Sequence, residues 1–392
     1  MSLKYLYVPS GYKAGKAYGV LPNEAAADLA FVRGSSATRI NANGLVETMG
    51  NNVPRLDYTD GSCPTLLTEP ESTNLVAESA EGIYGNPPDS ETQTLAPDGT
   101  NTAVIPTVGD LADRYQYTIS AGSATGDTKI TYSWHRKRLS TPSEDPNQTG
   151  DLKITNLVNC IQDGSTIQIG SDIGGYDRFS ATFDVVDGSL EAIIRLYFGE
   201  VVGIGNSSVA YFGHQVEIGA YATSYIPTDT DSTSTRSADT GVISGDLSSY
   251  INSSEGVLEI KAKALFNGGS DVRIGISDGT TDNRINLSWR EAASRMSIFM
   301  KASGGDVFDG GTVGFKNFTL THDQTEMATF KIKWKSGDIQ VKLNNTILLT
   351  QTDTFTMVGL DQVRLDAGYG SASNLFQGNV QYIKVYDSVT DF

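Results

Sequence analysis

Short strand-like segments at regular spacing, separated by turn residues, constrain this sequence more than any other feature. Segments such as KITYSWHRKRL (129–139) and RINLSWR (284–290) are rich in β-branched and aromatic residues. Asp187 and Gly188 form a hairpin turn signal between two such segments. No segment keeps a helical period over any length. The pattern therefore predicts an all-β fold.

The strand candidates fall into two series, 114–219 and 256–388, with a Ser/Thr/Asp-rich stretch between them. A chain of 392 residues is also long enough for more than one domain. We therefore expect two antiparallel jelly-roll β-sandwiches in series after an extended N-terminal segment. The expected boundaries are 1–75 for the extended segment, 76–228 for the first sandwich, 229–248 for the linker and 249–392 for the second sandwich.

Composition excludes several classes of protein. The net charge of -17 argues against a nucleic-acid groove, because phosphate binding needs clustered Lys and Arg. Cys63 and Cys160 fall in different expected domains, so a disulfide framework is not expected, and no pair of CxxC units is present to hold zinc. No segment approaches the roughly 20 apolar residues that cross a bilayer. The first residues also lack the pattern of a signal peptide.

Catalytic constellations are sparse. None of the three histidines has a second histidine two or four positions away, so metal ligation is not expected. The GxSxG, Walker and HExxH motifs are absent. We therefore predict a protein that is not an enzyme. A glycan-degrading enzyme remains an alternative, because acidic residues that could pair across a cleft lie on strand candidates. They are Glu191, Glu217 and Glu259.

Two turns alternate oxygen-bearing side chains, as calcium sites do. They are SDGTTDN (277–283) and TDTDSTS (228–234), and neither has the final glutamate of an EF-hand loop. Solvated turns explain them, so no cofactor is expected, with a structural calcium ion as the alternative.

Sugar binding pairs an aromatic ring, which stacks on C–H groups, with neighbouring hydrogen-bonding side chains. The candidates are Trp134, Trp289 with its neighbour Arg290, and Tyr369 in the loop AGYGSASN. A tryptophan on a strand also packs into the core, and this is the alternative for Trp134 and Trp289; Trp334 is assigned to the core. The basic run HRKRL (135–139) is either a protected strand edge or a contact for an acidic partner.

Two stretches resemble segments of tailed-phage virion proteins. The first, FVRGSSATRINANGLVETMGNNVPRLDYTDGSCPTLLTEPESTNL (31–75), resembles a segment that precedes carbohydrate-binding-like jelly rolls in those proteins. The second, QVEIGAYATSYIPTDTDSTSTRSADT (215–240), resembles the companion segment that ends such a jelly roll. Stretch 241–392 resembles concanavalin-A/laminin-G-like domains less specifically. The matched leader positions are Arg33, Ala37, Thr38, Gly44, Leu45, Pro54, Arg55, Asp57, Tyr58, Leu67, Glu69, Pro70, Thr73, Asn74 and Leu75.

The resemblance implies a virion appendage, a tail fibre, spike or capsid-attached protein, assembled in the host cytoplasm and displaying lectin-like domains to host surface glycans. It implies attachment to other virion proteins through residues 1–75 and a homo-oligomer. A trimer is one possible form, because fibres and spikes are generally three-fold, and nothing in the sequence dictates it. No nucleic acid and no membrane insertion are expected. The alternatives are a structural decoration protein without glycan binding and a depolymerase.

Overall fold

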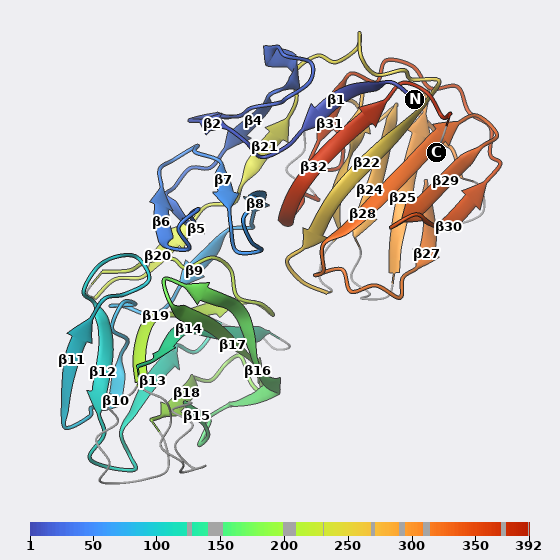
Figure 1. Ribbon diagram of the computed structural model, residues 1–392. Coiled ribbons are helices and arrows are strands. Elements are labelled where there is room, and N and C mark those ends of the chain that lie inside the picture. The colour runs from blue at the N-terminus through green and yellow to red at the C-terminus, as the bar shows by residue number, and fades with distance from the viewer. Residues whose placement is uncertain are drawn as a thin grey trace. The chain divides into compact units, whose positions relative to one another are not determined.

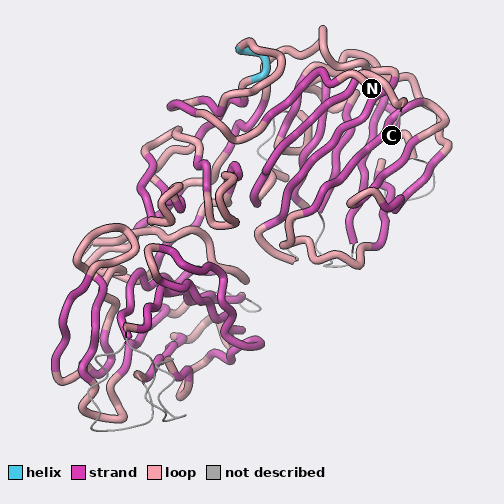
Figure 2. Tube along the Cα trace, in the orientation of Figure 1, coloured by secondary structure: helices cyan, strands magenta, loops and turns pink. Residues whose placement is uncertain are grey.

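The computed structural model describes residues 1–123, 128–139, 152–198, 209–229, 231–267, 271–289, 295–308, 314–369, 374–390 and 392. The predicted all-β class is confirmed, and strands and connecting loops account for nearly all of the described chain (Figure 2). The only helical turn in these ranges is the 3-10 turn η1 (Ala25–Ala27). No helix in these ranges is long and apolar enough to cross a membrane.

The chain divides into two compact units that differ from the expected domains. Unit 1 comprises residues 1–36, 49–70 and 237–392, and unit 2 comprises residues 37–48 and 71–236. The chain therefore passes between the units four times, and both units contain parts of the expected leader.

Unit 1 is a sandwich of two antiparallel sheets. The eight-stranded sheet has the order β30 (Thr346–Gln351), β29 (Ile339–Leu343), β28 (Ala328–Lys335), β22 (Glu255–Ala264), β32 (Gly378–Tyr386), β8 (Thr65–Thr68) and β7 (Arg55–Asp57), with β1 (Leu3–Tyr7) also paired to β32 (Figure 1). The ten-stranded sheet has the order β2 (Tyr12–Lys13), β3 (Lys16–Ala17), β4 (Leu29–Val32), β21 (Thr240–Ile243), β31 (Gln362–Arg364), β23 (Val272–Ser277), β24 (Arg284–Trp289), β25 (Arg295–Ala302) and β26 (Gly305–Asp306), with β27 (Phe315–Thr319) paired to β25.

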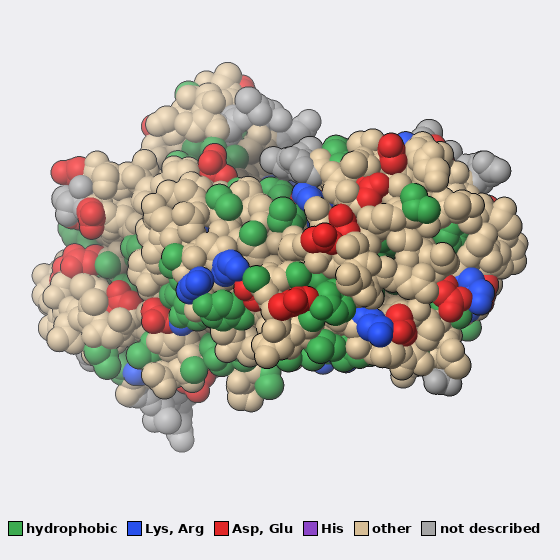
Figure 3. Space-filling model, turned by 90° about the horizontal axis from the view of Figure 1, so that it is seen from above, with side chains coloured by type: hydrophobic (Ala, Val, Ile, Leu, Met, Phe, Trp, Pro, Cys, Tyr) green, Lys and Arg blue, Asp and Glu red, His purple; other side chains and the backbone are tan. Residues whose placement is uncertain are grey.

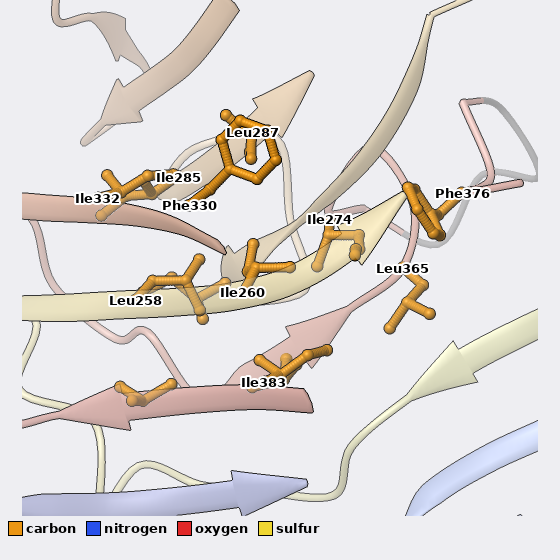
Figure 4. Close-up of a cluster of buried hydrophobic side chains, with 14 of the residues drawn as sticks. Leu258, Ile260, Ile274, Ile285, Leu287, Phe330, Ile332, Leu365, Phe376 and Ile383 are labelled. Atoms are coloured by element: carbon orange, nitrogen blue, oxygen red, sulfur yellow. The ribbon is translucent and has the colours of Figure 1, made fainter. Parts of the chain in front are cut away.

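One hydrophobic core joins the two sheets of unit 1. Leu258 and Ile260 of the eight-stranded sheet and Ile274 and Leu287 of the ten-stranded sheet are fully buried in it (Figure 4). Alternate residues of each strand supply this core, since successive side chains of a strand point to opposite faces. The other residues of each strand therefore face away from the core, and they form the two outward faces considered below.

Unit 2 is a second antiparallel sandwich. Its four-stranded sheet has the order β10 (Tyr84–Asn86), β13 (Arg114–Ile119), β18 (Ala192–Tyr197) and β15 (Lys153–Ile154). Its six-stranded sheet has the order β11 (Ser90–Thr94), β12 (Ala103–Thr107), β19 (Val209–Ile218), β14 (Lys129–Arg138), β17 (Tyr176–Val185) and β16 (Cys160–Ile173). Two short ladders complete the strands, β5 (Ala37–Ile40) with β6 (Val46–Met49), and β9 (Ser72–Asn74) with β20 (Ser234–Arg236).

Both faces of the six-stranded sheet are covered. On one face Ile130, Tyr132 and Trp134 pack with residues of the four-stranded sheet in the main core of unit 2. On the other face a smaller core contains Phe212 and Val46, and Val46 comes from the β5–β6 ladder. Part of the expected leader is therefore needed to cover this sheet.

The expected extended segment 1–75 and linker 229–248 are thus strands of the two units. In unit 1, Leu6 of β1 pairs with Lys384 of β32, and Ile243 of β21 pairs with Ala30 of β4. These segments are strands and not an extended leader and a linker, because they pair with other strands and β1 buries Tyr5 and Tyr7 in the core of unit 1. These pairings join residues far apart in sequence, which a local pattern does not reveal.

Several of the leader positions that carry the resemblance have structural roles. In unit 1 a buried ion cluster consists of Arg33, Arg55, Glu69 and Asp239, all at most 2% exposed. Arg33 lies 3.1 Å from Asp239, Arg55 lies 2.5 Å from Glu69, and Arg55 also contacts Asp239. Each member lies within a few residues of a different passage of the chain between the units. The two positive and two negative charges balance, which a buried group of ions requires.

In unit 2, Asn74, another position matched by the resemblance, also has a structural role. Its amide nitrogen donates to the carbonyl oxygens of His214 and Ile226, and its amide oxygen accepts from the backbone of Val76 and Val216. All of these contacts are internal to unit 2 and buried. The resemblance therefore rests on residues that build the fold.

Candidate functional site

Alternation along β24 decides which side chains of RINLSWR enter the core and which point away from it. Ile285, Leu287 and Trp289 enter the core of unit 1, so Arg284, Asn286 and Ser288 face outward. Trp289 is 2% exposed, and its ring packs against Phe330 and Phe376 at centroid distances of 5.6 and 4.9 Å. A sugar platform at Trp289 is therefore wrong, because neither face of the ring is open.

Trp134 fails as a platform for the same reason. It shares the inward face of β14 with Ile130 and Tyr132 and is 3% exposed. Its ring stacks on Tyr132 at 4.9 Å and on Phe179 at 5.8 Å. Arg290 lies outside the described residues.

The outward face of the ten-stranded sheet instead carries an alternating row of rings and guanidinium groups. We call it the arginine–aromatic face, and it consists of Phe315, Arg273, Phe299, Arg284 and Tyr369. Arg273 lies 4.9 Å from the Phe315 ring and 5.5 Å from the Phe299 ring. Arg284 lies 4.5 Å from the Phe299 ring and 4.6 Å from the Tyr369 ring. The strand register explains the row, since Phe299 pairs with Phe315 on one side and Asn286 on the other.

Arg284 also fixes the loop that carries Tyr369. Its Nη1 donates to the carbonyl oxygen of Ala367 at 2.8 Å, and Asn286 donates to the same oxygen at 3.2 Å. Gly368 follows with a φ of +93°, and a Cβ there would lie 3.3 Å from Arg284 Cδ. A glycine is required at that close approach. Tyr369 is partly exposed, so it is the predicted site residue that the structure leaves accessible.

The charge of Arg284 is unusual for a side chain only 7% exposed. Its neighbours are paired, Arg273 with Asp271 at 3.3 Å and Arg364 with Asp366 at 2.7 Å. Arg284 has no carboxylate partner within 4.0 Å in the part of the chain that the structure describes. Burial lowers the pKa of Arg284, and the positive charge of Arg273 adds to this effect. A nearly buried cation without an anion is costly, so Arg284 is a candidate for a binding site.

A polar layer lies on the same outward face of the sheet. Asn286, Ser288 and Ser297 are fully buried, and Ser288 pairs with Ser297 in the strand register. The amide oxygen of Asn286 and both hydroxyl oxygens have no hydrogen-bond partner among the described residues. A buried polar atom without a partner costs about 1–3 kcal/mol, and bound water or a ligand normally satisfies it.

The three acidic candidates differ in burial and in hydrogen bonding. Glu217 is 1% exposed and accepts hydrogen bonds from Ser72, Thr223 and Gln215. Burial opposes ionisation of Glu259, but hydrogen bonds from Lys384 and Tyr382 lower its pKa overall. Glu191 is exposed.

The histidines differ in environment. His135 and His214 are buried in unit 2, and burial lowers the pKa of both. His322 lies 3.7 Å from Glu326.

The first of the two calcium candidate turns is closed by hydrogen bonds of its own residues. In the first turn, Asp278 accepts hydrogen bonds from the backbone and hydroxyl of Thr280 and from Asn283. The second turn includes residue 230, which is outside the described residues. In the described ranges, no three His, Cys, Asp or Glu side chains are grouped so that they could hold a metal ion.

Comparison with known proteins gives fold likenesses only. No family model matches the chain, and no curated protein matches it. Solved structures with similar folds include the Ruminococcus gnavus IT-sialidase CBM40 bound to α2,3-sialyllactose, at 15% sequence identity and a TM-score of 0.30, covering 36% of this chain and 80% of that one. Domains LG4–5 of the mouse laminin α1 chain match at 10% identity and a TM-score of 0.25, covering 69% of this chain and 87% of that one. The β-sandwich assignment rests on the strand pairing described above.

Proposed function

We propose that this chain is a non-catalytic glycan-binding protein and that unit 1 binds the sugar at Tyr369 and Arg284. The single observation that carries the proposal is the stack of the nearly buried Arg284 guanidinium on a partly exposed tyrosine ring. An aromatic ring offers its face to the C–H groups of a sugar, and a guanidinium donates hydrogen bonds to its oxygens.

The geometry favours binding of a ligand that touches both groups. Ala367 fixes Arg284 on one side and Phe299 supports it on the other, so the guanidinium is oriented before any ligand arrives. Preorganisation of this kind reduces the entropy that binding costs. The neighbouring buried polar layer has oxygen atoms that internal water can satisfy.

The proposal includes a biological setting that rests on the resemblance of residues 31–75 and 215–240 to phage proteins. In that setting the chain is a virion appendage that adheres to host surface glycans. Residues 1–75 are strands of the two units, so attachment to other virion proteins would use a folded surface. Detection of the protein on purified particles by immunogold labelling tests this setting separately from sugar binding.

The binding test is a glycan array probed with the full chain, followed by titration of the best glycan with variants. We expect Tyr369→Ala to weaken binding by about tenfold or more, in line with about 1–2 kcal/mol for a lost ring contact. Tyr197→Ala is the matched control, because Tyr197 is also partly exposed and stacks on an arginine, Arg114, at 5.5 Å in unit 2.

Three results would count against the proposal. Equal losses of glycan affinity in Tyr369→Ala and Tyr197→Ala would contradict the assignment of the binding site to the arginine–aromatic face. Absence of any bound glycan would favour a decoration protein, and release of reducing ends from a polysaccharide would favour a depolymerase.

A further inference from the structure

The outward face of the eight-stranded sheet gathers lysines in an acidic protein. Successive alternate positions of β28 are lysines, and alternate positions of β22, β29 and β32 add more. We call this surface the lysine face. Its lysines are Lys261, Lys263, Lys331, Lys333, Lys335, Lys342 and Lys384.

The strand register sets these side chains in rows across the sheet. Lys342, Lys331, Glu259 and Lys384 occupy consecutive paired positions on β29, β28, β22 and β32. Directly paired residues lie about 5 Å apart, and alternate residues of one strand lie about 7 Å apart. The face is therefore a regular array of positive charge.

Carboxylates neutralise only part of this array. Glu259 is shared by Lys331 at 3.5 Å and Lys384 at 3.1 Å, so one negative charge serves two positive ones. Glu255 pairs with Lys335 at 2.7 Å. Asp338 and Asp60 reach the face from outside its strands, and they pair with Lys333 and Lys263.

The array keeps unpaired positive charge. Lys261 and Lys342 form no ion pair with any carboxylate in the described ranges. Like charges on neighbouring strands repel each other, so this arrangement lowers the stability of the sheet. On the face drawn in Figure 3, acidic and basic side chains lie interspersed among uncharged ones.

Two aromatic rings on the lysine face are already covered by lysines. Lys384 lies 4.1 Å from the Tyr382 ring, and Lys342 lies 4.2 Å from the Phe392 ring. Single-stranded nucleic acid binds where open aromatic faces and arginines are available, and this face contains no arginine on β22, β28, β29 or β32.

A membrane surface fits less well. Membrane-binding faces insert several large apolar side chains. On the lysine face Val257 is fully buried, and Ile347, which pairs with Lys342, is the one exposed large apolar side chain on the described strands of this sheet. A flexible chain with repeated negative charges needs only point charges at regular intervals, which lysines provide.

We propose that the lysine face is a second binding site, for an acidic polysaccharide, and that it is independent of the arginine–aromatic face. The polysaccharide binds through its carboxylate or sulfate groups, which pair with several lysines at once. The long-range field of a chain with net charge -17 opposes such a ligand, and so the lysine face must act at short range.

The test uses heparin and polygalacturonate as polyanionic polysaccharides and dextran as the neutral one. We expect the full chain to bind both polyanions, with an affinity that falls steeply with salt, and not to bind dextran. The double variant Lys261→Glu/Lys342→Glu should bind about tenfold more weakly or worse and show a smaller salt dependence.

Two controls keep the result specific. Lys13→Glu/Lys153→Glu changes the net charge by the same amount at exposed lysines outside this face, and it should retain most of the affinity. Tyr369→Ala should leave polyanion binding unchanged. The two proposals can therefore fail separately. Tyr369→Ala tests sugar binding at the arginine–aromatic face, and Lys261→Glu/Lys342→Glu tests polyanion binding at the lysine face.

Several outcomes would overturn the proposal. The first is wild-type affinity for the polyanions in the lysine-face variant, and the second is an equal loss of affinity in the control variant. The third is binding of single-stranded DNA or anionic vesicles that is at least as tight as binding of the polysaccharides and depends equally on Lys261 and Lys342. A circular dichroism spectrum and a urea midpoint like those of the wild type establish that the variant is folded. If that variant unfolds, Lys261→Gln/Lys342→Gln tests the same charges, and unchanged affinity in it also overturns the proposal.

Discussion

Unit 2 should lose stability in mild acid because of its buried histidines, and His214 gives the sharpest prediction. His214 is fully buried in the main core of unit 2, where Tyr132 lies 2.6 Å from its Nδ1 atom. Burial lowers the pKa of His214 from 6.5 to about 3. The unfolded chain therefore binds a proton between these two pH values that the folded chain does not bind.

The sign and size of the effect follow from proton linkage. The folded pKa is depressed, so the stability from neutral His214 is complete above pH 6.5 and decreases as the pH falls toward 3. At pH 5 the loss relative to pH 7 is about 2 kcal/mol for this one group. His135 should act in the same direction, because burial and the charge of Arg178 also lower its pKa.

The assay compares urea unfolding of the wild type and His214→Asn at pH 7 and pH 5. Hydrogen exchange of the amides of β14 and β19, measured in the same samples, reports unit 2 alone. The wild type should lose about 2 kcal/mol more than His214→Asn between the two pH values. The control is His322→Asn in unit 1, which should leave the pH dependence of unit 2 unchanged. An identical pH dependence in the wild type and His214→Asn would refute the reasoning.

Three further predictions concern the folding of the units. Arg55→Met should destabilise unit 1 by about 3–5 kcal/mol in urea unfolding, because it leaves two buried carboxylates of the ion cluster with one arginine; Lys263→Met, at the partly exposed pair with Asp60, should cost less than about 1 kcal/mol. Trp289→Ala should cost about 3–5 kcal/mol, so any loss of glycan binding in it should accompany unfolding. Removal of residues 1–75 should leave neither unit folded, and a cooperative unfolding transition in fragment 76–392 would contradict this expectation.

The local pattern of the sequence predicts the strands better than their partners. The segments around β14, β24 and β28 lie where the turn residues and β-forming side chains place them. The pairing of β1 with β32 joins the two ends of the chain. The leader has no long apolar run of its own, so its place in the core depends on strands that follow hundreds of residues later.

The candidate site was predicted in part. The loop position of Tyr369 indicates that its side chain is exposed. In the structure Tyr369 is partly exposed and stacks on Arg284. Trp289 could have been assigned to the core from the sequence, because its alternation partners Ile285 and Leu287 are apolar while Arg284 and Ser288 are polar. The pairing that brings Phe299 and Phe315 beside the arginines needs the strand register, which no local pattern contains.

The central claim is that a glycan binds unit 1 at the arginine–aromatic face. The most direct measurement is a crystal structure of the full chain with the glycan that binds best on the array. We expect a sugar ring against the exposed face of Tyr369, with at least one of its oxygens within hydrogen-bond distance of Arg284. Electron density for the glycan on unit 2 or on the lysine face, with this face empty, would contradict the account.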